Sequence, residues 1–179
     1  MARLPYVEEP RAPKRGSEPA VAAVYAEVRS LGRPLLNLYR VLANQPEALR
    51  AFLRMSRYIR DQSALAPPLR ELTILATAFA LGARYEQVHH LAAARRVGVS
   101  EAKLGAFPAW QAGAAFDPAE RAAMNYAHEV ATTRRVRDAT FDTLRAHFTP
   151  PQIIDLALTV GWYHLCSALL EPLEVDVEQ

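Results

Sequence analysis

The 179-residue sequence is short of cysteine and of net charge, and each shortage excludes a class of protein. Its single cysteine, Cys166, permits neither an internal disulfide bond nor a cluster of thiolate metal ligands, which suits a reducing cytoplasm. Lys and Arg together number 21 against 19 Asp and Glu, and the resulting charge of +2 is too small to suggest a nucleic-acid partner.

Targeting signals and long apolar runs are also missing. The N-terminus, "MARLPYVEEPRAPKRGSEP", has no apolar core of a signal peptide, and no run reaches the roughly 18 apolar residues of a membrane span. The hydrophobic fraction of 51% beside a charged fraction of 22% is that of a folded protein. We therefore expect a cytoplasmic globular protein with no membrane partner.

Strand signals are equally scarce, because alternating runs are short and hairpin turns are absent. Residues 1–18, rich in proline and charge, predict an extended arm on the surface or on a partner subunit. The remainder, 19–175, predicts a single all-α domain in which Pro and Gly mark the helix ends. The predicted helices cover residues 17–30, 34–44, 46–62, 66–83, 84–97, a short piece from 100, 117–132, 138–148 and 149–173. Residues 107–116 are expected to form a loop.

Two of these segments are apolar on almost every side. The helix after Pro67 and Pro68 has this pattern, which indicates a buried helix. The last helix, which Thr149 is expected to cap, has few polar positions for its length. It either threads the centre of the bundle or forms a subunit interface.

The most reactive side chains follow the buried helix, in "GARYEQVHH". Glu86 and His90 are four residues apart on one helical face, so the carboxylate can hold one imidazole nitrogen and raise the basicity of the other. Glu71 lies on the preceding helix, and a meeting of Glu71 with Glu86 in one subunit would need a steep crossing of the two helices. On spacing alone, a surface ion pair remains the more common meaning of Glu86 and His90.

A metal site and a reactive thiol have less support in the sequence than acid–base chemistry. Glu86 and His89 form a Glu-x-x-His motif, but the second such motif that a di-iron bundle needs is absent, so we expect no metal. Cys166 lies in an apolar helix and is interpreted as a buried, inert thiol. His164 could face a pocket or be a hydrogen-bonded core histidine, and Tyr85 and Tyr163 could line a cavity or simply pack.

These segments resemble the carboxymuconolactone decarboxylase family, which includes the alkylhydroperoxidase D (AhpD) branch. The matching text is "LAPPLRELTILATAFALGARYEQVHHLAAARRVGVSEAKL", with its "YExxxH" and "GVSE" elements. Upstream "NLYRVLANQPEALRAFL" and downstream "FDPAERAAMNYAHEV" and "HFTPPQIIDLALTVGWYHLCSALL" extend the resemblance over residues 35–172. It implies an AhpD-like all-helical fold, assembly with itself as homotrimers or homohexamers, and a site near a subunit boundary.

The resemblance also assigns residues. In the peroxidase branch a glutamate, a Cys-x-x-Cys pair and a histidine correspond to Glu71, Ala83, Glu86 and His90 of this sequence, and the relay histidine corresponds to Tyr85. Both thiols are missing, which argues against disulfide-cycling peroxidase activity.

The cysteine-free branch implies loss of carbon dioxide from a small carboxylate or lactone, without a cofactor. Glu86, His90 and Glu71 are then the catalytic candidates, with His90 as the acid and Glu86 orienting it. Candidates for contact with the small-molecule substrate are Tyr85, His89, Arg84 as an anion anchor, and His164. Two alternatives stay open: a peroxidase-like oxidoreductase, and an oligomeric binding protein without catalytic activity.

Overall fold

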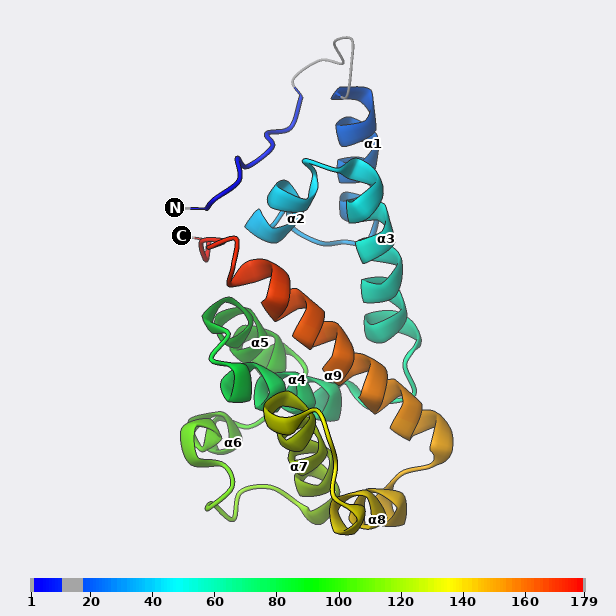
Figure 1. Ribbon diagram of the computed structural model, residues 1–179, viewed down its shortest axis with the longest axis vertical. Coiled ribbons are helices and arrows are strands. Elements are labelled where there is room, and N and C mark those ends of the chain that lie inside the picture. Colours follow the sequence, from blue (N-terminus) through cyan, green and yellow to red (C-terminus); the bar gives the residue numbers. More distant parts are fainter. Residues whose placement is uncertain (1, 11–17, 179) are drawn as a thin grey trace. The chain divides into compact units, whose positions relative to one another are not determined.

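The chain forms two compact units in the computed structural model, which describes residues 2–10 and 18–178 (Figure 1). Met1–Tyr58 and Leu170–Gln179 make up the first unit, and Ile59–Leu169 the second. The described residues contain nine α-helices and no strand, so the all-α prediction is confirmed. Whether 19–175 is a single domain stays a prediction.

The first unit contains α1 (Glu18–Ser30), α2 (Asn37–Leu42) and α3 (Pro46–Arg57). Its N-terminal residues 2–10 run without helix or strand beside the C-terminal segment, where the Arg3 amide donates to the Leu173 carbonyl at 2.8 Å. The Tyr25 hydroxyl fixes the same stretch by donating to the Val7 carbonyl at 2.7 Å. The rest of the predicted arm, and the predicted cap Ser17, lie outside the described residues.

Helix α2 begins three residues later than the sequence predicts. Pro34 was the expected start, but Leu36 has an extended conformation and Asn37 opens the helix. The Asn37 amide donates to the carboxylate of Glu178, which comes from the far end of the chain. A cap from so distant a residue leaves no local trace in the sequence.

The second unit begins with a π-helical turn, η1 (Tyr58–Gln62, of which Tyr58 belongs to the first unit), where the sequence predicts the continuation of α3. The elements that follow are α4 (Pro67–Leu81), α5 (Arg84–Arg96), α6 (Glu101–Gly105), the short 3₁₀ turn η2 (Phe107–Ala109), α7 (Pro118–Thr133), α8 (Asp138–His147) and α9 (Pro150–Leu170). Apart from η2, the predicted loop 107–116 is irregular.

Local signals set most of these boundaries. Pro67 and Pro68 occupy the first turn of α4, and Gly82 ends it in the left-handed conformation (φ +66°) that favours glycine. At α7 the predicted capping box is present, with Asp117 accepting from the Glu120 amide at 2.8 Å. At α9 the Gln152 side chain accepts from the Thr149 amide at 3.0 Å.

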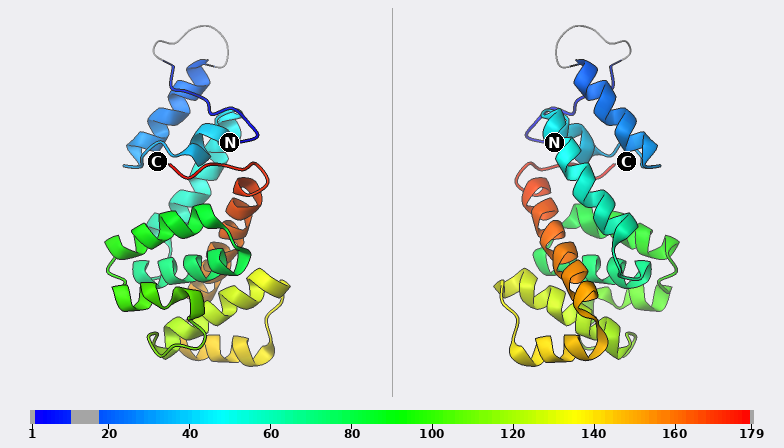
Figure 2. Two further views of the ribbon diagram at one scale, coloured as in Figure 1. Left: turned by 90° about the vertical axis from the view of Figure 1, so that its left-hand side faces the viewer. Right: turned by 90° about the vertical axis from the view of Figure 1, so that its right-hand side faces the viewer.

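The core of the second unit surrounds α4. Leu72 and Leu75 of α4 pack with Met124 of α7 and Val160 of α9 in one apolar cluster. A second cluster joins Leu156 of α9 to residues of α7 and α8. Figure 2 shows α9 lying along one side of the helices of this unit rather than through their centre.

Helix α9 is also the one described helix with the length and mean hydropathy of a membrane span (21 residues, mean hydropathy 1.5). The expectation from the sequence concerned uninterrupted apolar runs, and Asp155, Thr159 and His164 interrupt the one in α9. A helix packed against a protein core passes the same test, and α9 contributes Leu156 and Val160 to the core. The absence of a membrane partner and the cytoplasmic location stay predictions.

Candidate active site

The candidate site is built on the hairpin of α4 and α5. Gly82 lets the chain reverse between the helices, and the Gln87 side chain of α5 donates to the Ala78 carbonyl of α4 at 3.2 Å. This hairpin brings together three polar side chains in the interior of the unit. Glu71, Glu86 and His90 are 2%, 4% and 2% exposed, so the surface-pair interpretation of Glu86 and His90 is wrong.

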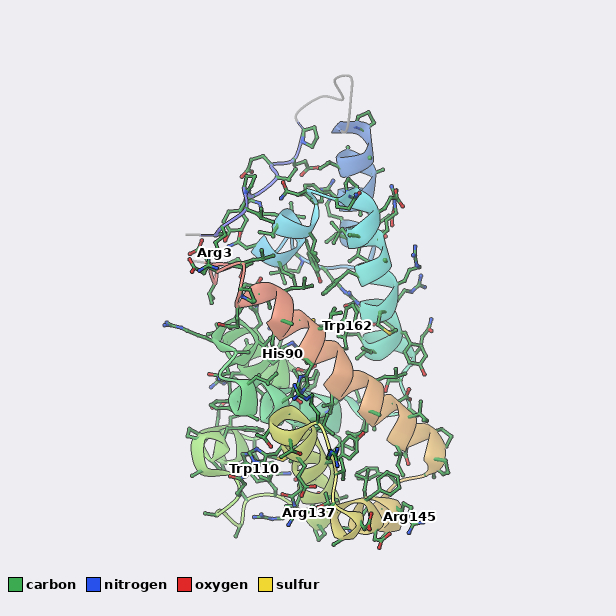
Figure 3. The ribbon with its side chains drawn as sticks, viewed as in Figure 1. Arg3, His90, Trp110, Arg137, Arg145 and Trp162 are labelled. Atoms are coloured by element: carbon green, nitrogen blue, oxygen red, sulfur yellow. The ribbon has the colours of Figure 1, made fainter. Side chains whose placement is uncertain are left out.

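The imidazole of His90 lies between the two carboxylates. Its Nδ1 is 2.6 Å from Oε2 of Glu71, and its Nε2 is 3.2 Å from Oε2 of Glu86. Figure 3 places His90 among the helices of the second unit, beside α9. Because each nitrogen faces a carboxylate oxygen, the arrangement suits an imidazolium that donates on both sides.

The three residues meet within one chain, with His90 between the two carboxylates. Glu71 lies about 16 Å before the turn and His90 about 12 Å after it, at 1.5 Å per helical residue. Glu86 is the third residue of α5, within its first turn. Glu71 and Glu86 therefore lie at different distances from the turn between the helices. His90 is one helical turn beyond Glu86, and its imidazole ring lies between the two carboxylates.

Burial and charge set the protonation states of this cluster. Desolvation lowers the pKa of His90, but the charge of Glu71 and hydrogen bonds to both carboxylates outweigh it and raise that pKa above 6.5. Burial likewise opposes ionisation of Glu71, yet His90 and the nearby Arg60 and Arg70 lower its pKa below 4.5. The geometry thus favours a charged Glu71–His90 pair.

Two residues beyond the predicted set lie near the cluster: Tyr163 contacts His90, and Arg60 contacts Tyr163. The ring of Tyr163, from α9, meets the imidazole edge to face with centroids 4.7 Å apart. Arg60, from the π-helical turn, donates to the Tyr163 hydroxyl at 3.4 Å. Burial raises the pKa of Tyr163 well above its usual range, so the phenol remains a neutral donor.

Arg70 forms a hydrogen bond with the π-helical turn. This arginine is 7% exposed, and its Nη1 donates to the Arg60 carbonyl at 3.0 Å, which ties η1 to α4. Short π-helical segments occur frequently at functional sites. The turn places the Arg60 side chain where it contacts Tyr163.

Cys166, one turn after Tyr163 on α9, is buried as predicted. Burial raises the pKa of its thiol well above the usual range, and Glu86 raises it further, although Arg60 opposes the change. The thiolate form that nucleophilic chemistry needs is therefore disfavoured.

The predicted substrate contacts are scattered. Tyr85 is buried and its ring lies 4.4 Å from that of His89, on the same helix as Glu86. Arg84 is exposed at the start of α5. His164 is partly buried on α9, where burial and the charge of Arg134 lower its pKa. The contacts we identify do not join Arg84 or His164 to His90.

Sequence signals for the additional residues differ in strength. Arg70 precedes Glu71 within a helix that is otherwise apolar, and a buried arginine there requires a partner. Tyr163 stands next to His164 in an apolar helix, which permits either packing or a role at a site. Arg60 has no such signal, because nothing in its neighbourhood predicts a π-helical turn.

Within residues 2–10 and 18–178, no group of three or more His, Cys, Asp and Glu side chains is arranged to hold a metal ion. At the candidate site the geometry gives the reason. Both nitrogens of His90 point at carboxylate oxygens, so the three side chains do not direct lone pairs at one common point.

Comparisons with known proteins agree with this fold. Residues 46–129 match the model of the carboxymuconolactone decarboxylase family. The uncharacterised protein YdfG of Bacillus subtilis (strain 168) is 26% identical over 118 residues, which cover 65% of this chain and 80% of YdfG.

Solved structures resemble the whole chain. An uncharacterised peroxidase-related protein of Ralstonia eutropha JMP134, described as an alkylhydroperoxidase AhpD core, superposes with a TM-score of 0.82 at 21% identity, covering 99% of this chain and 93% of that one. A cysteine-to-alanine variant of the debrominase Bmp8, in complex with 2,3,4-tribromopyrrole, gives a TM-score of 0.80 at 20% identity, covering 99% and 94%. A peroxidase-related protein of Silicibacter sp. TM1040 gives 0.78 at 19% identity, covering 99% and 95%.

These TM-scores establish a shared fold, and the segment that matches the family model includes the hairpin with Glu71, Glu86 and His90. The resemblance seen in the sequence is thus confirmed: residues 46–129 match the carboxymuconolactone decarboxylase family model, and the chain has an AhpD-like fold.

Proposed function

We propose that this chain is an enzyme that transfers protons without a cofactor, as a decarboxylase-like lyase or an isomerase of a small carboxylate or lactone. The observation that carries the proposal is the imidazole of His90, held at both nitrogens by buried carboxylates. A surface pair with the same residues would exchange protons with bulk water. In the interior, a proton on Nε2 has Glu86 as its acceptor.

The geometry favours a different distribution of roles from that expected from the sequence. His90 has no nitrogen left to face a substrate, so one of the carboxylates takes that place. Glu71 makes the shorter contact with the imidazole and its pKa is lowered, which suits a fixed anion that positions His90. Glu86 makes the longer contact of 3.2 Å, so we assign Glu86 as the catalytic acid and base and His90 as its proton relay.

This assignment accounts for each step of a decarboxylation. The bond between the substrate carbon and its carboxylate breaks, carbon dioxide leaves, and the electron pair moves onto a conjugated carbonyl. The resulting dienolate carbon then takes one proton from the Glu86–His90 pair, which water replenishes. In an isomerase the same pair would remove a proton from one carbon and return it to another.

The neighbouring phenol supports the same chemistry. Tyr163 keeps its proton, because burial raises its pKa, and its hydroxyl accepts from Arg60. A neutral phenol beside a cation is a suitable donor to a carbonyl oxygen on which negative charge develops. We therefore add Tyr163 as a candidate for substrate binding.

The peroxidase alternative has less support. The positions of the two thiols are occupied by Ala83 and Glu86, and the one cysteine is buried with a raised pKa. One of the similar solved structures is that of a debrominase, so this fold can carry an enzymatic site. Debromination itself is a property of that protein and is not proposed for this chain.

The test is turnover of carboxymuconolactone, followed as carbon dioxide release, and exchange of substrate protons in D₂O for a panel of small carboxylates and lactones. Glu86→Gln should lower kcat by about a hundredfold or more, since general acid–base groups contribute at least that much. Matched controls are Glu101→Gln and His147→Gln, which change exposed residues of the same types, and both should retain full activity.

Two results would contradict the proposal. Hydroperoxide consumption with a thiol donor that Cys166→Ser abolishes would establish the peroxidase alternative. Absence of any proton exchange, together with ligand-induced stabilisation that Glu86→Gln leaves intact, would indicate a binding protein without catalytic activity.

A further inference from the structure

Arg60, on the π-helical turn η1, is a half-buried cation close to the candidate site. Its Nη2 donates to the Tyr163 hydroxyl at 3.4 Å, and the ring of that tyrosine packs on the imidazole of His90. A guanidinium has several N–H donors in one plane, so the same cation can hold a phenol and donate to a ligand oxygen. Arg60 and Tyr163 thus offer two neighbouring donors on one side of His90.

The backbone of Arg60 is held in this position by Arg70. The Arg60 carbonyl accepts from Nη1 of Arg70 at 3.0 Å, and Arg70 is buried in α4 next to Glu71. Arg70 also has a buried donor, its Nε, for which the residues that the structure describes supply no acceptor. This part of the interior therefore holds more donors than its own acceptors use. A cation that is fixed before the reaction stabilises new negative charge without reorganisation.

The charge of Arg60 favours negative charge on three side chains of the site. It helps to lower the pKa of Glu71, and it opposes the burial that raises the pKa values of Tyr163 and Cys166. These side chains come from α4 and α9, so the field of the guanidinium extends over the space around His90. An oxygen atom that becomes negative in this space gains the same kind of stabilisation.

The movement of charge in a decarboxylation decides which part of a substrate needs this cation. Negative charge leaves the carboxylate as carbon dioxide departs, collects on the oxygen of the conjugated carbonyl, and returns to carbon when the proton arrives. A cation beside the carboxylate would stabilise the substrate more than the transition state and slow the reaction. A cation beside the carbonyl oxygen stabilises the transition state more. Removal of a proton in an isomerase places charge on the same oxygen.

We propose that Arg60 is a further catalytic residue, which forms with Tyr163 the site for the carbonyl oxygen on which negative charge develops. The inference rests on the proposed function and orients the substrate within it. The carbonyl oxygen faces Arg60 and Tyr163, and the carbon that exchanges a proton faces Glu86. The substrate class narrows to carboxylates and lactones whose reacting carbon is conjugated with a carbonyl. In this arrangement the charge is held by Arg60 and not by Arg84, which is exposed at the start of α5.

The first experiment measures the binding of 4-nitrophenol to the full chain. Its phenolate oxygen resembles the negative oxygen of a dienolate, and the absorbance of the anion reports its ionisation. Donors to the anion should shift the titration of the bound phenol to lower pH. Arg60→Gln should reduce that shift and weaken binding of the anion by about tenfold or more. The control is Arg95→Gln, at an exposed arginine of α5 that pairs with Glu101, and it should bind the anion like the wild type.

Arg60→Gln should fold, because the hydrogen bond from Arg70 uses the backbone carbonyl, which the substitution keeps. Circular dichroism checks this. A second measurement needs no variant: the wild type should bind 4-nitrophenolate more tightly than 4-nitroanisole, the neutral methyl ether of the same ring. Equal affinity for the two, no binding of the anion, or an affinity that Arg60→Gln leaves intact would overturn the proposal. So would loss of the anion in Arg84→Gln but not in Arg60→Gln.

The second experiment separates kcat from KM in the turnover of carboxymuconolactone. Because the contact strengthens in the transition state, Arg60→Gln should lower kcat by about a hundredfold and change KM by less than about threefold. A raised KM with unchanged kcat would mean that Arg60 binds the substrate carboxylate, and it would overturn the proposal. The two proposals fail separately, since absence of turnover contradicts the proposed function, whereas nitrophenol binding tests the site of Arg60 and Tyr163 without any reaction.

Discussion

The Arg29–Glu9 ion pair of the first unit and the Glu71–His90 pair of the second have the same length but opposite surroundings. Arg29 and Glu9 are 2.6 Å apart with side chains that are 49% and 46% exposed, whereas His90 and Glu71 are 2.6 Å apart at 3% and 2%. An exposed ion pair contributes little to the free energy of folding, because each charge loses hydration when it gains its partner. A buried pair that loses one member leaves a charge in the interior. Burial, and not distance, therefore decides which contact controls a protonation state.

The largest expected effect is the loss of Glu71. Glu71→Gln should lower the free energy of unfolding of the second unit by about 3–5 kcal/mol, because it removes the buried partner of His90. Trp110 and Trp162 are the two tryptophans and both lie in this unit, so tryptophan fluorescence during urea denaturation reports its unfolding. A loss below about 1 kcal/mol would show that the pair is not charged in the folded chain.

The pH dependence of stability should have two limbs. The raised pKa of His90 adds stability that is fully present below pH 6.5 and is lost as the pH rises through the raised value. The lowered pKa of Glu71 adds stability that is present above pH 4.5 and is lost as the pH falls through the lowered value. Urea denaturation from pH 3 to 10 should therefore show greatest stability between about pH 4.5 and 6.5.

The basic limb has its own control. In His90→Gln the fall in stability above pH 6.5 should flatten, whereas His147→Gln, an exposed histidine of α8, should leave the profile unchanged. A basic limb that persists in His90→Gln would assign it to another group.

A smaller effect is expected for Tyr163→Phe. This substitution keeps the ring that packs on His90 and removes only the hydroxyl. The hydrogen bond that is lost, from Arg60 to this hydroxyl, is long at 3.4 Å. The free energy of unfolding should fall by less than about 1.5 kcal/mol. If the phenol donates to the substrate carbonyl, kcat should fall by about tenfold or more in the proton-exchange assay. Unchanged kcat would limit Tyr163 to packing.

The smallest effect is expected in the first unit. Arg29→Gln removes an exposed ion pair, so hydrogen exchange of the amides of α1, followed by mass spectrometry, should match that of the wild type. Faster exchange throughout α1 would mean that exposed pairs matter here more than their surroundings suggest.

Much of the fold could be predicted because its signals are local. Pro67 with Gly82 delimits α4, and Asp117 with Glu120 marks the start of α7. What the sequence could not predict depends on distant residues: the Glu178 carboxylate at the start of α2, and the π-helical turn that presents Arg60.

The candidate site shows the same division. The four-residue spacing of Glu86 and His90 made their contact predictable, but it does not indicate whether the two side chains are buried. Glu71 was a candidate through family resemblance, and its direct contact with His90 appears only when α4 and α5 are folded against each other. Tyr163 comes from a helix more than seventy residues later, which no local pattern connects to the hairpin.

The most direct test of the central claim is a pH titration of His90 by NMR in protein with ¹⁵N-labelled histidine, with His90→Gln assigning the signal. An imidazole held between two buried carboxylates should remain protonated at both nitrogens at pH 6.5 and lose its proton only at higher pH. A His90 signal that is already neutral at pH 6.5 would contradict the account.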